Sequence, residues 1–228
     1  MHLFLYTVKL KNYIKTNFNN DSKLYLLMQS FYRRTVFPLE RFVWKRNIAK
    51  GFESGSSLHM CSLLPKSTLD KVIRYYKPKT WLDVGCGTGS SLKYVKKKGI
   101  EIMGLENSSL AIKASKLGNQ IKKCDLTIPL DLDRNFDVVW CYEVAEHLPE
   151  EKADILADTL VKHGNIIVLS AATRGQGGDG HINEQPHTYW IEKMANRGFI
   201  VDKEITEEIH ALNELYSCNV HCFKKLLL

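Results

Sequence analysis

The stretch Trp81-Leu-Asp-Val-Gly-Cys-Gly-Thr-Gly-Ser90 decides the fold, because it places three glycines within five residues directly after a short apolar run. Residues 80–84 have the composition of a buried strand, and residues 90–98 continue with the spacing of a helix. Glycines permit a tight turn and a close approach of the backbone to a ligand. The spacing is GxGxG, which is neither the dinucleotide fingerprint GxGxxG nor a P-loop, because no Gly-Lys-Ser/Thr follows.

Outward from this stretch, strand and helix patterns alternate, which is typical of an α/β fold. We expect strands at residues 80–84, 100–105, 120–124, 136–140, 165–170, 199–204 and 215–223. We expect helices at residues 90–98, 108–117, 150–162 and 187–197. Right-handed crossovers then give a doubly wound, mostly parallel, seven-stranded Rossmann-like sheet. Residues 126–135 are too short for a crossover helix and predict a loop. We expect no helix in residues 205–214, which separate the last two strands. These two strands should therefore form a hairpin, which leaves one antiparallel strand in the sheet.

Composition bounds the class of protein. The apolar runs all fall short of the roughly 18 residues that a membrane-spanning helix needs, so we expect no transmembrane segment. The six cysteines of the chain lie far apart and form no CxxC pair. That usage is typical of reduced thiols and predicts a cytoplasmic protein without a disulfide framework.

The N-terminal quarter carries the charge excess of the chain. Residues 1–60 hold ten Lys/Arg against three Asp/Glu, which accounts for the whole formal net charge of +7. We divide the chain into a basic, aromatic-rich helical cap, residues 1–57, and a second domain, residues 58–228. The cap has three alternative roles: a lid over a pocket, a surface for nucleic-acid phosphates, or a contact with an anionic membrane. The sequence leaves these three open.

Acidic side chains follow the first three expected strands. Asp83 precedes the glycine turn, Glu106 ends the second strand and Asp125 follows the third. Ligands of such sheets bind beyond the carboxyl ends of the strands, so we expect the three acids to meet there. They would repel a pyrophosphate, and they suit a nucleoside that carries a positive sulfonium. Glu106 is placed to accept from both ribose hydroxyls.

At this point the chain resembles a known family. The segments WLDVGCGTGS, MGLENS, KCDLT and FDVVWCYEVAEHLPE are similar, in order and spacing, to the successive motifs of class I S-adenosylmethionine-dependent methyltransferases, including small-molecule and ubiquinone-pathway enzymes. The similarity spans about residues 65–225. It implies S-adenosylmethionine as the cofactor and an enzyme that transfers its methyl group.

The resemblance also implies the cofactor-binding residues. They are Asp83, Gly85, Cys86, Gly87, Gly89, Glu106, Asp125, Leu126 and Cys141. Asp83, Gly85 and Gly87 would contact the methionine end. Glu106 would hold the ribose and Asp125 with Leu126 the adenine, while Cys141 would line the floor beside the methyl group.

The acceptor side is expected in the glycine-rich segment 174–187, which follows the fifth strand and so overhangs the methyl group. His181 is our candidate for the base that takes a hydroxyl proton. Asn183, Glu184 and His187 are candidates for substrate-binding or orienting groups. We expect the acceptor to be a hydroxyl of a small molecule or glycan. The alternative is RNA methylation, with the basic residues 1–57 holding the strand.

The segment Glu143-Val-Ala-Glu-His147 has two interpretations. As part of the cofactor pocket wall, it contributes His147 as a second catalytic candidate. Alternatively, Glu143, Glu146 and His147 share a helical face and bind a divalent metal with His181, similar to the small-RNA 3′-terminal 2′-O-methyltransferases. From the sequence we favour the first interpretation, in which the site has no metal.

Overall fold

The computed structural model describes residues 63–178 and 180–226. These residues belong to a compact unit, Gly55–Leu228. The predicted helical cap of residues 1–57, with its boundary and its three alternative roles, lies outside the described residues. Within the described part, no helix is both long enough and apolar enough to span a membrane.

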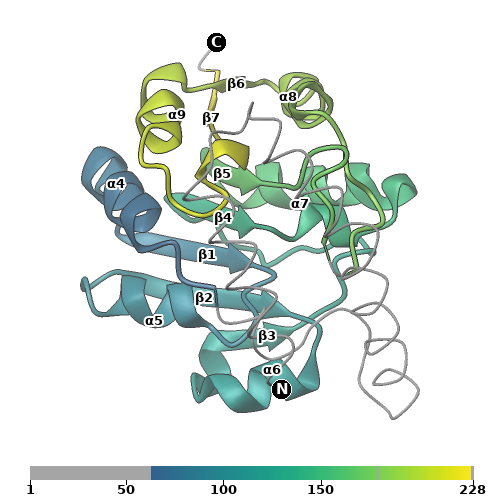
Figure 1. Ribbon diagram of the computed structural model, residues 1–228. Coiled ribbons are helices and arrows are strands. Elements are labelled where there is room, and N and C mark those ends of the chain that lie inside the picture. Colours follow the sequence, from purple (N-terminus) through teal and green to yellow (C-terminus); the bar gives the residue numbers. More distant parts are fainter. Residues whose placement is uncertain (1–62, 179, 227–228) are drawn as a thin grey trace, which may run out of the picture. The chain divides into compact units, whose positions relative to one another are not determined.

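A seven-stranded sheet forms the centre of this unit (Figure 1). Its strands are β1 Thr80–Val84, β2 Glu101–Glu106, β3 Ile121–Lys123, β4 Val138–Tyr142, β5 Ile166–Ser170, β6 Phe199–Val201 and β7 Val220–Lys225. The strand order is β3-β2-β1-β4-β5-β7-β6, and β7 is antiparallel to both of its neighbours while the other pairs are parallel. The predicted doubly wound sheet is confirmed. The strand order reverses at β1 and β4, which is where ligands bind in such sheets.

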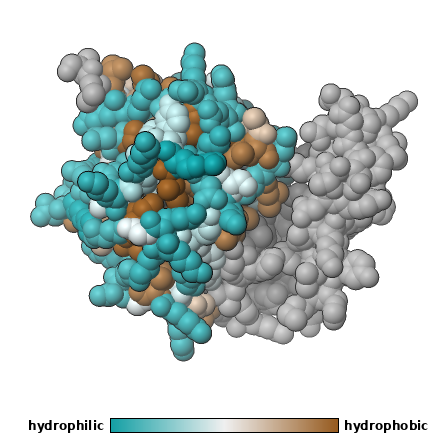
Figure 2. All heavy atoms as spheres, turned by 90° about the vertical axis from the view of Figure 1, so that its left-hand side faces the viewer, coloured by the Kyte–Doolittle hydropathy of each residue, from teal (hydrophilic) through white to brown (hydrophobic). Residues whose placement is uncertain are grey.

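Helices lie on both faces of the sheet (Figure 1). The α-helices are α4 Lys66–Tyr76, α5 Ser90–Lys96, α6 Ser109–Ser115, α7 Ala153–His163, α8 His187–Ala195 and α9 Lys203–His210. The short 3₁₀ helices of the described residues are η3 Gly118–Gln120, η4 Ala145–His147, η5 Glu150–Lys152 and η6 Ser217–Asn219. Figure 2 looks onto the side of α4, α5 and α9, where hydrophilic side chains cover most of the surface.

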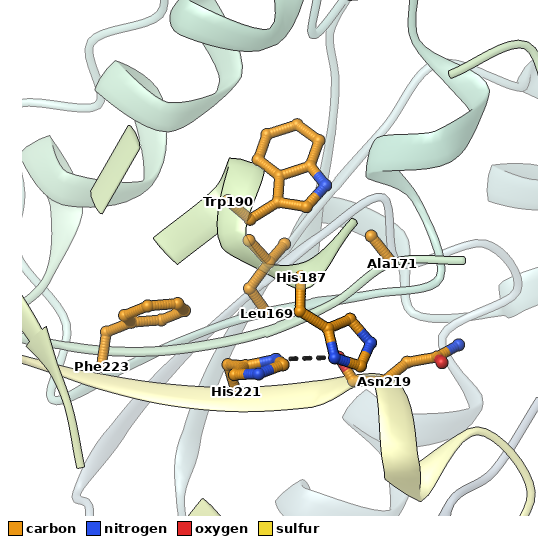
Figure 3. A pocket seen from close by; sticks show the side chains of 7 residues that line it. All are labelled: Leu169, Ala171, His187, Trp190, Asn219, His221 and Phe223. Atoms are coloured by element: carbon orange, nitrogen blue, oxygen red, sulfur yellow. Dashed lines mark hydrogen bonds between the residues drawn. The ribbon is translucent and has the colours of Figure 1, made fainter. Parts of the chain in front are cut away.

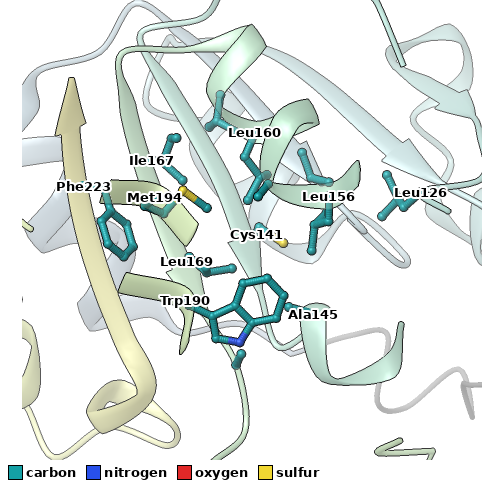
Figure 4. Close-up of a cluster of buried hydrophobic side chains, with 14 of the residues drawn as sticks. Leu126, Cys141, Ala145, Leu156, Leu160, Ile167, Leu169, Trp190, Met194 and Phe223 are labelled. Carbon is teal, nitrogen blue, oxygen red and sulfur yellow. The ribbon is translucent and has the colours of Figure 1, made fainter. Parts of the chain in front are cut away.

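Strand alternation divides the core between the two faces. Trp81, Val138 and Trp140 point to one face and pack with α4, α5 and α9. Cys141 and Ile167 point to the opposite face and pack with α7 and α8, and Figure 4 shows part of this second cluster. Because both faces of the sheet are buried, its strands carry nearly continuous apolar runs.

Two expectations for the C-terminal part are corrected. A helix, α9, connects β6 and β7, where we expected an unstructured connection. Its apolar face contains Ile205 and Ile209, which are one helical turn apart and fully buried. The helical pattern of apolar residues is therefore present in the sequence, but it spans a single turn. The strand expected at 199–204 ends at Val201 for the same reason. The loop predicted at 126–135 is confirmed as a segment without regular helix or strand.

Candidate functional site

The glycine turn between β1 and α5 needs its glycines. Gly85, Gly87 and Gly89 have φ angles of 78°, 54° and 70°, in the left-handed region that side chains disfavour. A Cβ on Gly85 would lie 2.5 Å from a methyl carbon of Val144. The amides of Gly85 and Cys86 both donate to the carbonyl of Leu105, at 2.8 and 2.9 Å. The turn is therefore anchored to the end of β2.

Two acids lie at this turn. Oε2 of Glu106 accepts from the amide of Gly87 at 2.7 Å, and its Oε1 accepts from the amides of Asn107 and Ser108. Asp83 is 4% exposed. Burial, with the charge of Glu106, raises the pKa of Asp83 to about 8. A cation bound near Asp83 and Glu106 would offset the cost of burying the Asp83 carboxylate and its repulsion by Glu106.

Asp125 follows β3, whose last residue lies beside Glu106 in the sheet. Its Oδ1 accepts from the amide and the hydroxyl of Thr127, at 2.8 and 2.7 Å, and these bonds lower the pKa of Asp125. The side chain of Leu126 is buried in the core. The structure therefore brings the three predicted acids to the ends of three adjacent strands.

The second half of the site begins where β4 ends. Cys141, the residue before the end of β4, is fully buried. Burial, together with the charges of Glu146 and Asp83, raises the pKa of its thiol. Cys141 thus lies within the electrostatic influence of both Asp83 and Glu146. The five cysteines in the described ranges are all free thiols.

Glu146, in η4, fixes the glycine-rich segment 171–186. Its backbone carbonyl accepts from the amides of Ile182 and Asn183, both at 3.0 Å, and its Oε1 accepts from the amide of Ala172 at 3.2 Å. Both ends of the segment are therefore held against one residue. This segment overlaps the predicted acceptor segment, residues 174–187, whose position over a bound methyl group stays a prediction.

Three potential ligand atoms converge here. One atom each from Glu146, His147 and His181 lies within 4.8 Å of the others. The rings of His147 and His181 meet edge to face, with centroids 5.0 Å apart. Nε2 of His181 lies 4.0 Å from Oε1 of Glu146. The two histidines predicted as catalytic are thus brought together, and they lie beside a buried carboxylate.

Glu184 organises the segment around His181. Its Oε1 accepts from Nδ1 of His181 at 2.9 Å and from the amide of Gly177 at 2.7 Å, and its Oε2 accepts from the amide of Gly175 at 2.8 Å. One carboxylate therefore fixes both the glycine-rich turn and the histidine ring. These bonds are compatible with the orienting role predicted for Glu184, one of the two roles that the sequence left open.

Glu143 is not one of the three converging residues. Its Oε1 accepts from the hydroxyl of Ser170 and from Nδ2 of Asn219, the latter at 3.2 Å. The same amide of Asn219 also donates to Oε1 of Gln176 at 3.0 Å. Sequence reasoning missed Ser170 and Asn219, because no spacing rule connects positions so far apart in the chain. Glu143 precedes η4, Ala145–His147, so the predicted helical face of Glu143, Glu146 and His147 does not form. Glu146 and His147 instead converge with His181, the fourth residue of that prediction.

A small pocket lies nearby, at the ends of β5 and α8 (Figure 3). Its lining is Leu169, Ala171, His187, Trp190, Asn219, His221 and Phe223. The rings of His187 and His221 have centroids 4.7 Å apart, and burial lowers the pKa of both. His187, predicted as a substrate-binding or orienting group, thus lines this pocket.

Comparisons with known proteins agree with this geometry. Residues 82–163 match the methyltransferase domain family. A ubiquinone biosynthesis O-methyltransferase of Nitrosomonas europaea is 32% identical over 126 residues, which cover 51% of this chain and 54% of the relative. The chain thus spans about half the length of this curated relative.

Two solved structures share the fold. The sugar N-methyltransferase KedS8 from Streptoalloteichus sp. has a TM-score of 0.56 at 13% identity, and the match covers 82% of this chain and 93% of that chain. The methyltransferase domain of bacterial CtHen1-C has a TM-score of 0.55 at 16% identity, covering 72% of this chain and 97% of that chain. At these identities the likeness concerns the fold.

Proposed function

We propose that this chain is a class I S-adenosylmethionine-dependent methyltransferase that transfers the methyl group of that cofactor to a hydroxyl of a small molecule or glycan. The observation that carries the proposal is the buried carboxyl of Asp83 beside Glu106, at a glycine turn that lacks side chains. S-adenosylmethionine carries an ammonium and a sulfonium, so its positive end suits this pair of acids. The glycines leave room for its methionine part.

The cofactor would extend along the edge of the sheet from β1 to β3. Asp83 and the amides of the glycine turn would hold the methionine end. Glu106 would accept from the ribose hydroxyls, and Asp125 with the backbone of Leu126 would meet the adenine. The methyl group would then lie near Cys141. The order of these contacts follows the order of the strands.

Methyl transfer from a sulfonium is an in-line displacement. The acceptor oxygen must approach the methyl carbon to about 3–3.5 Å in a site that excludes water. A hydroxyl also has to lose its proton as the new bond forms, and groups that assist this loss speed the reaction. Glu146, His147 and His181 are the polar groups we propose for this task. The segment 171–186, fixed by Glu146 and Glu184, would cover the acceptor.

Isothermal titration with S-adenosylmethionine tests the cofactor side. We expect Glu106→Ala to weaken binding by about 1.5–3 kcal/mol, the range for hydrogen bonds to a charged group. Asp137→Ala is the matched control, because Asp137 also accepts from two backbone amides but at the amino end of β1. Absence of binding by the parent chain would reject the proposed function. Equal losses in the two variants would reject the ribose assignment.

Proton release on cofactor binding tests Asp83. The pKa of this carboxyl is raised to about 8, so the carboxyl is largely protonated at pH 7. A cationic ligand favours the carboxylate, so binding below pH 8 should release a proton and affinity should rise as pH rises toward 8. Titrations at pH 7 in two buffers of different ionisation enthalpy measure the release. The Asp83→Asn variant should not release the proton that comes from Asp83. Any proton released by the ligand itself is released with both proteins. Identical release by both proteins would refute this role.

The alternative of RNA methylation depends on residues 1–57, which carry the positive charge. The described residues offer no observation that favours a nucleic-acid acceptor. We therefore retain the small-molecule or glycan hydroxyl as the proposed acceptor, in a protein for which the reduced cysteines suggest a cytoplasmic location.

A further inference from the structure

Tyr216 has a backbone conformation that a tyrosine rarely adopts. It lies in the loop between α9 and β7, with φ 64° and ψ 6°, in the left-handed region. A bulky side chain at positive φ is an outlier, because its Cβ crowds the backbone there. Such strain clusters at functional sites, where the surrounding contacts enforce it. A glycine would adopt this conformation without strain, so the presence of tyrosine points to a role for its side chain.

The loop before Tyr216 is fixed at two points. The carboxylate of Glu214 accepts from the amide and the hydroxyl of Thr68, in the first turn of α4, at 2.8 and 2.7 Å. The carbonyl of Leu215 accepts from the hydroxyl of Tyr142, the last residue of β4, at 2.8 Å. The second contact holds the loop at the carboxyl end of β4. Tyr216 therefore follows directly on a segment that is fixed at the edge of the sheet where the site lies.

The loop after Tyr216 is joined to the acceptor side of the site. The carbonyl of Tyr216 accepts from the amide of Asn219 at 3.0 Å. The side-chain amide of Asn219 in turn donates to Glu143, which follows β4, and to Gln176 in the glycine-rich segment, at 3.2 and 3.0 Å. A single residue thus connects Tyr216 with an acid at the end of β4 and with the segment that we propose to cover the acceptor.

The side chain of Tyr216 is half-buried near two acids. Burial, followed by the charges of Glu143 and Glu146, raises the pKa of its hydroxyl to about 12, so the hydroxyl keeps its proton at neutral pH. None of the hydrogen bonds within residues 63–178 and 180–226 uses this hydroxyl, and it is not among their enclosed polar atoms. It is therefore a donor that a ligand can reach.

We propose that Tyr216 binds the acceptor and selects an uncharged hydroxyl group beside the oxygen that takes the methyl group. A hydroxyl can accept from Tyr216 and at the same time donate to the carboxyl group of Glu143 or Glu146. A carboxylate or a phosphodiester can only accept, and the charge of Glu143 would repel it. The tyrosine ring adds an apolar face for the ring of a sugar or another small molecule. This inference rests on the proposed function and narrows its acceptor to a molecule with several hydroxyl groups and no negative charge.

Tyr216→Phe tests the inference, because it removes the hydroxyl and keeps the ring. Metabolite and glycan pools are each separated on an anion exchanger into an anionic fraction and a fraction without negative charge. Both proteins then receive tritiated S-adenosylmethionine and a dilution series of each fraction. We expect label in a fraction without negative charge. In Tyr216→Phe the half-saturating amount of that fraction should rise by about 2- to 12-fold, the effect of one net hydrogen bond. The maximal rate and the affinity for S-adenosylmethionine should not change.

Tyr216→Gly removes the ring as well and relieves the backbone strain. Its half-saturating amount should rise further than that of Tyr216→Phe, because the contact with the ring is also lost. Its thermal midpoint should stay within about 4 °C of the parent, since relief of strain offsets lost packing. Asn213→Gly is the matched control, because Asn213 has φ 51° in the same loop and its side-chain amide meets the carbonyl of Ala211. This variant should transfer like the parent.

The outcomes separate this inference from the function on which it rests. Label confined to the anionic fractions, or parent-like half-saturation in both Tyr216 variants, would overturn the role of Tyr216 and leave methyl transfer standing. A loss in Tyr216→Phe that accompanies weaker binding of S-adenosylmethionine or a lower thermal midpoint would indicate a packing role and would also overturn it. A parent chain that neither binds S-adenosylmethionine nor transfers label would reject the proposed function, and the role of Tyr216 with it.

Discussion

His181→Ala is expected to lower the turnover of methyl transfer by about 10²- to 10⁴-fold, the contribution typical of a residue that assists proton transfer. The affinity for S-adenosylmethionine should stay unchanged, because His181 lies with Glu146 and His147 and not at the glycine turn. The loss is expected whether His181 acts as a base or as a metal ligand. Single-turnover transfer of a tritiated methyl group, combined with calorimetric binding of the cofactor, measures both quantities.

Glu184→Gln is the variant with which the loss of turnover in His181→Ala is compared. A glutamine oxygen can still accept from one backbone amide, but it does not replace the charged contact with Nδ1 of His181. Turnover should fall less than in His181→Ala, and cofactor affinity should again be unchanged. Turnover of His181→Ala at the parent level would remove His181 from the acceptor side.

Trp140→Ala is expected to reduce the free energy of unfolding by about 3–5 kcal/mol, the usual cost of truncating a fully buried aromatic side chain. Trp140 has no exposed surface and lies in the central strand β4. Its ring stacks on Tyr142 with centroids 5.0 Å apart and lies 5.4 Å from the ring of Trp81. Urea unfolding, followed by circular dichroism, measures the change.

The control for that variant is Tyr75→Phe, on the surface of α4. Tyr75 is 37% exposed and its hydroxyl donates to Glu204 at 2.8 Å. Exposed substitutions of this kind usually change stability by no more than about 0.5 kcal/mol. A cost below about 1 kcal/mol for Trp140→Ala would contradict the packing described for β4.

The elements around the glycine turn could be predicted from the sequence because their signals are local. β1 matches the expected residues 80–84, and Ser108 caps α6 as predicted, accepting from the amide of Ala111 at 3.2 Å. Each signal is complete within a few residues: an apolar run, a glycine that needs a positive φ, or a capping side chain. The acids at the strand ends follow from the same strands, because parallel strands end at one edge.

Other features depend on contacts between distant segments. The bond from Asn219 to Glu143 joins residues 76 positions apart, and no pattern near either residue indicates it. The grouping of His181 with Glu146 needs the backbone bonds of Ile182 and Asn183 to the Glu146 carbonyl. α9 was missed because a short amphipathic helix after a strand has the same alternation at its start as a longer strand.

Transfer of a tritiated methyl group from S-adenosylmethionine into separate pools of metabolites, glycans and RNA tests the central claim most directly. The parent chain and Glu106→Ala are compared in each pool, so that label depends on the cofactor site. The account predicts label on hydroxyl oxygens in the metabolite or glycan pool, greatly reduced in Glu106→Ala. Label confined to RNA, or no label in any pool with the cofactor recovered intact, would contradict it.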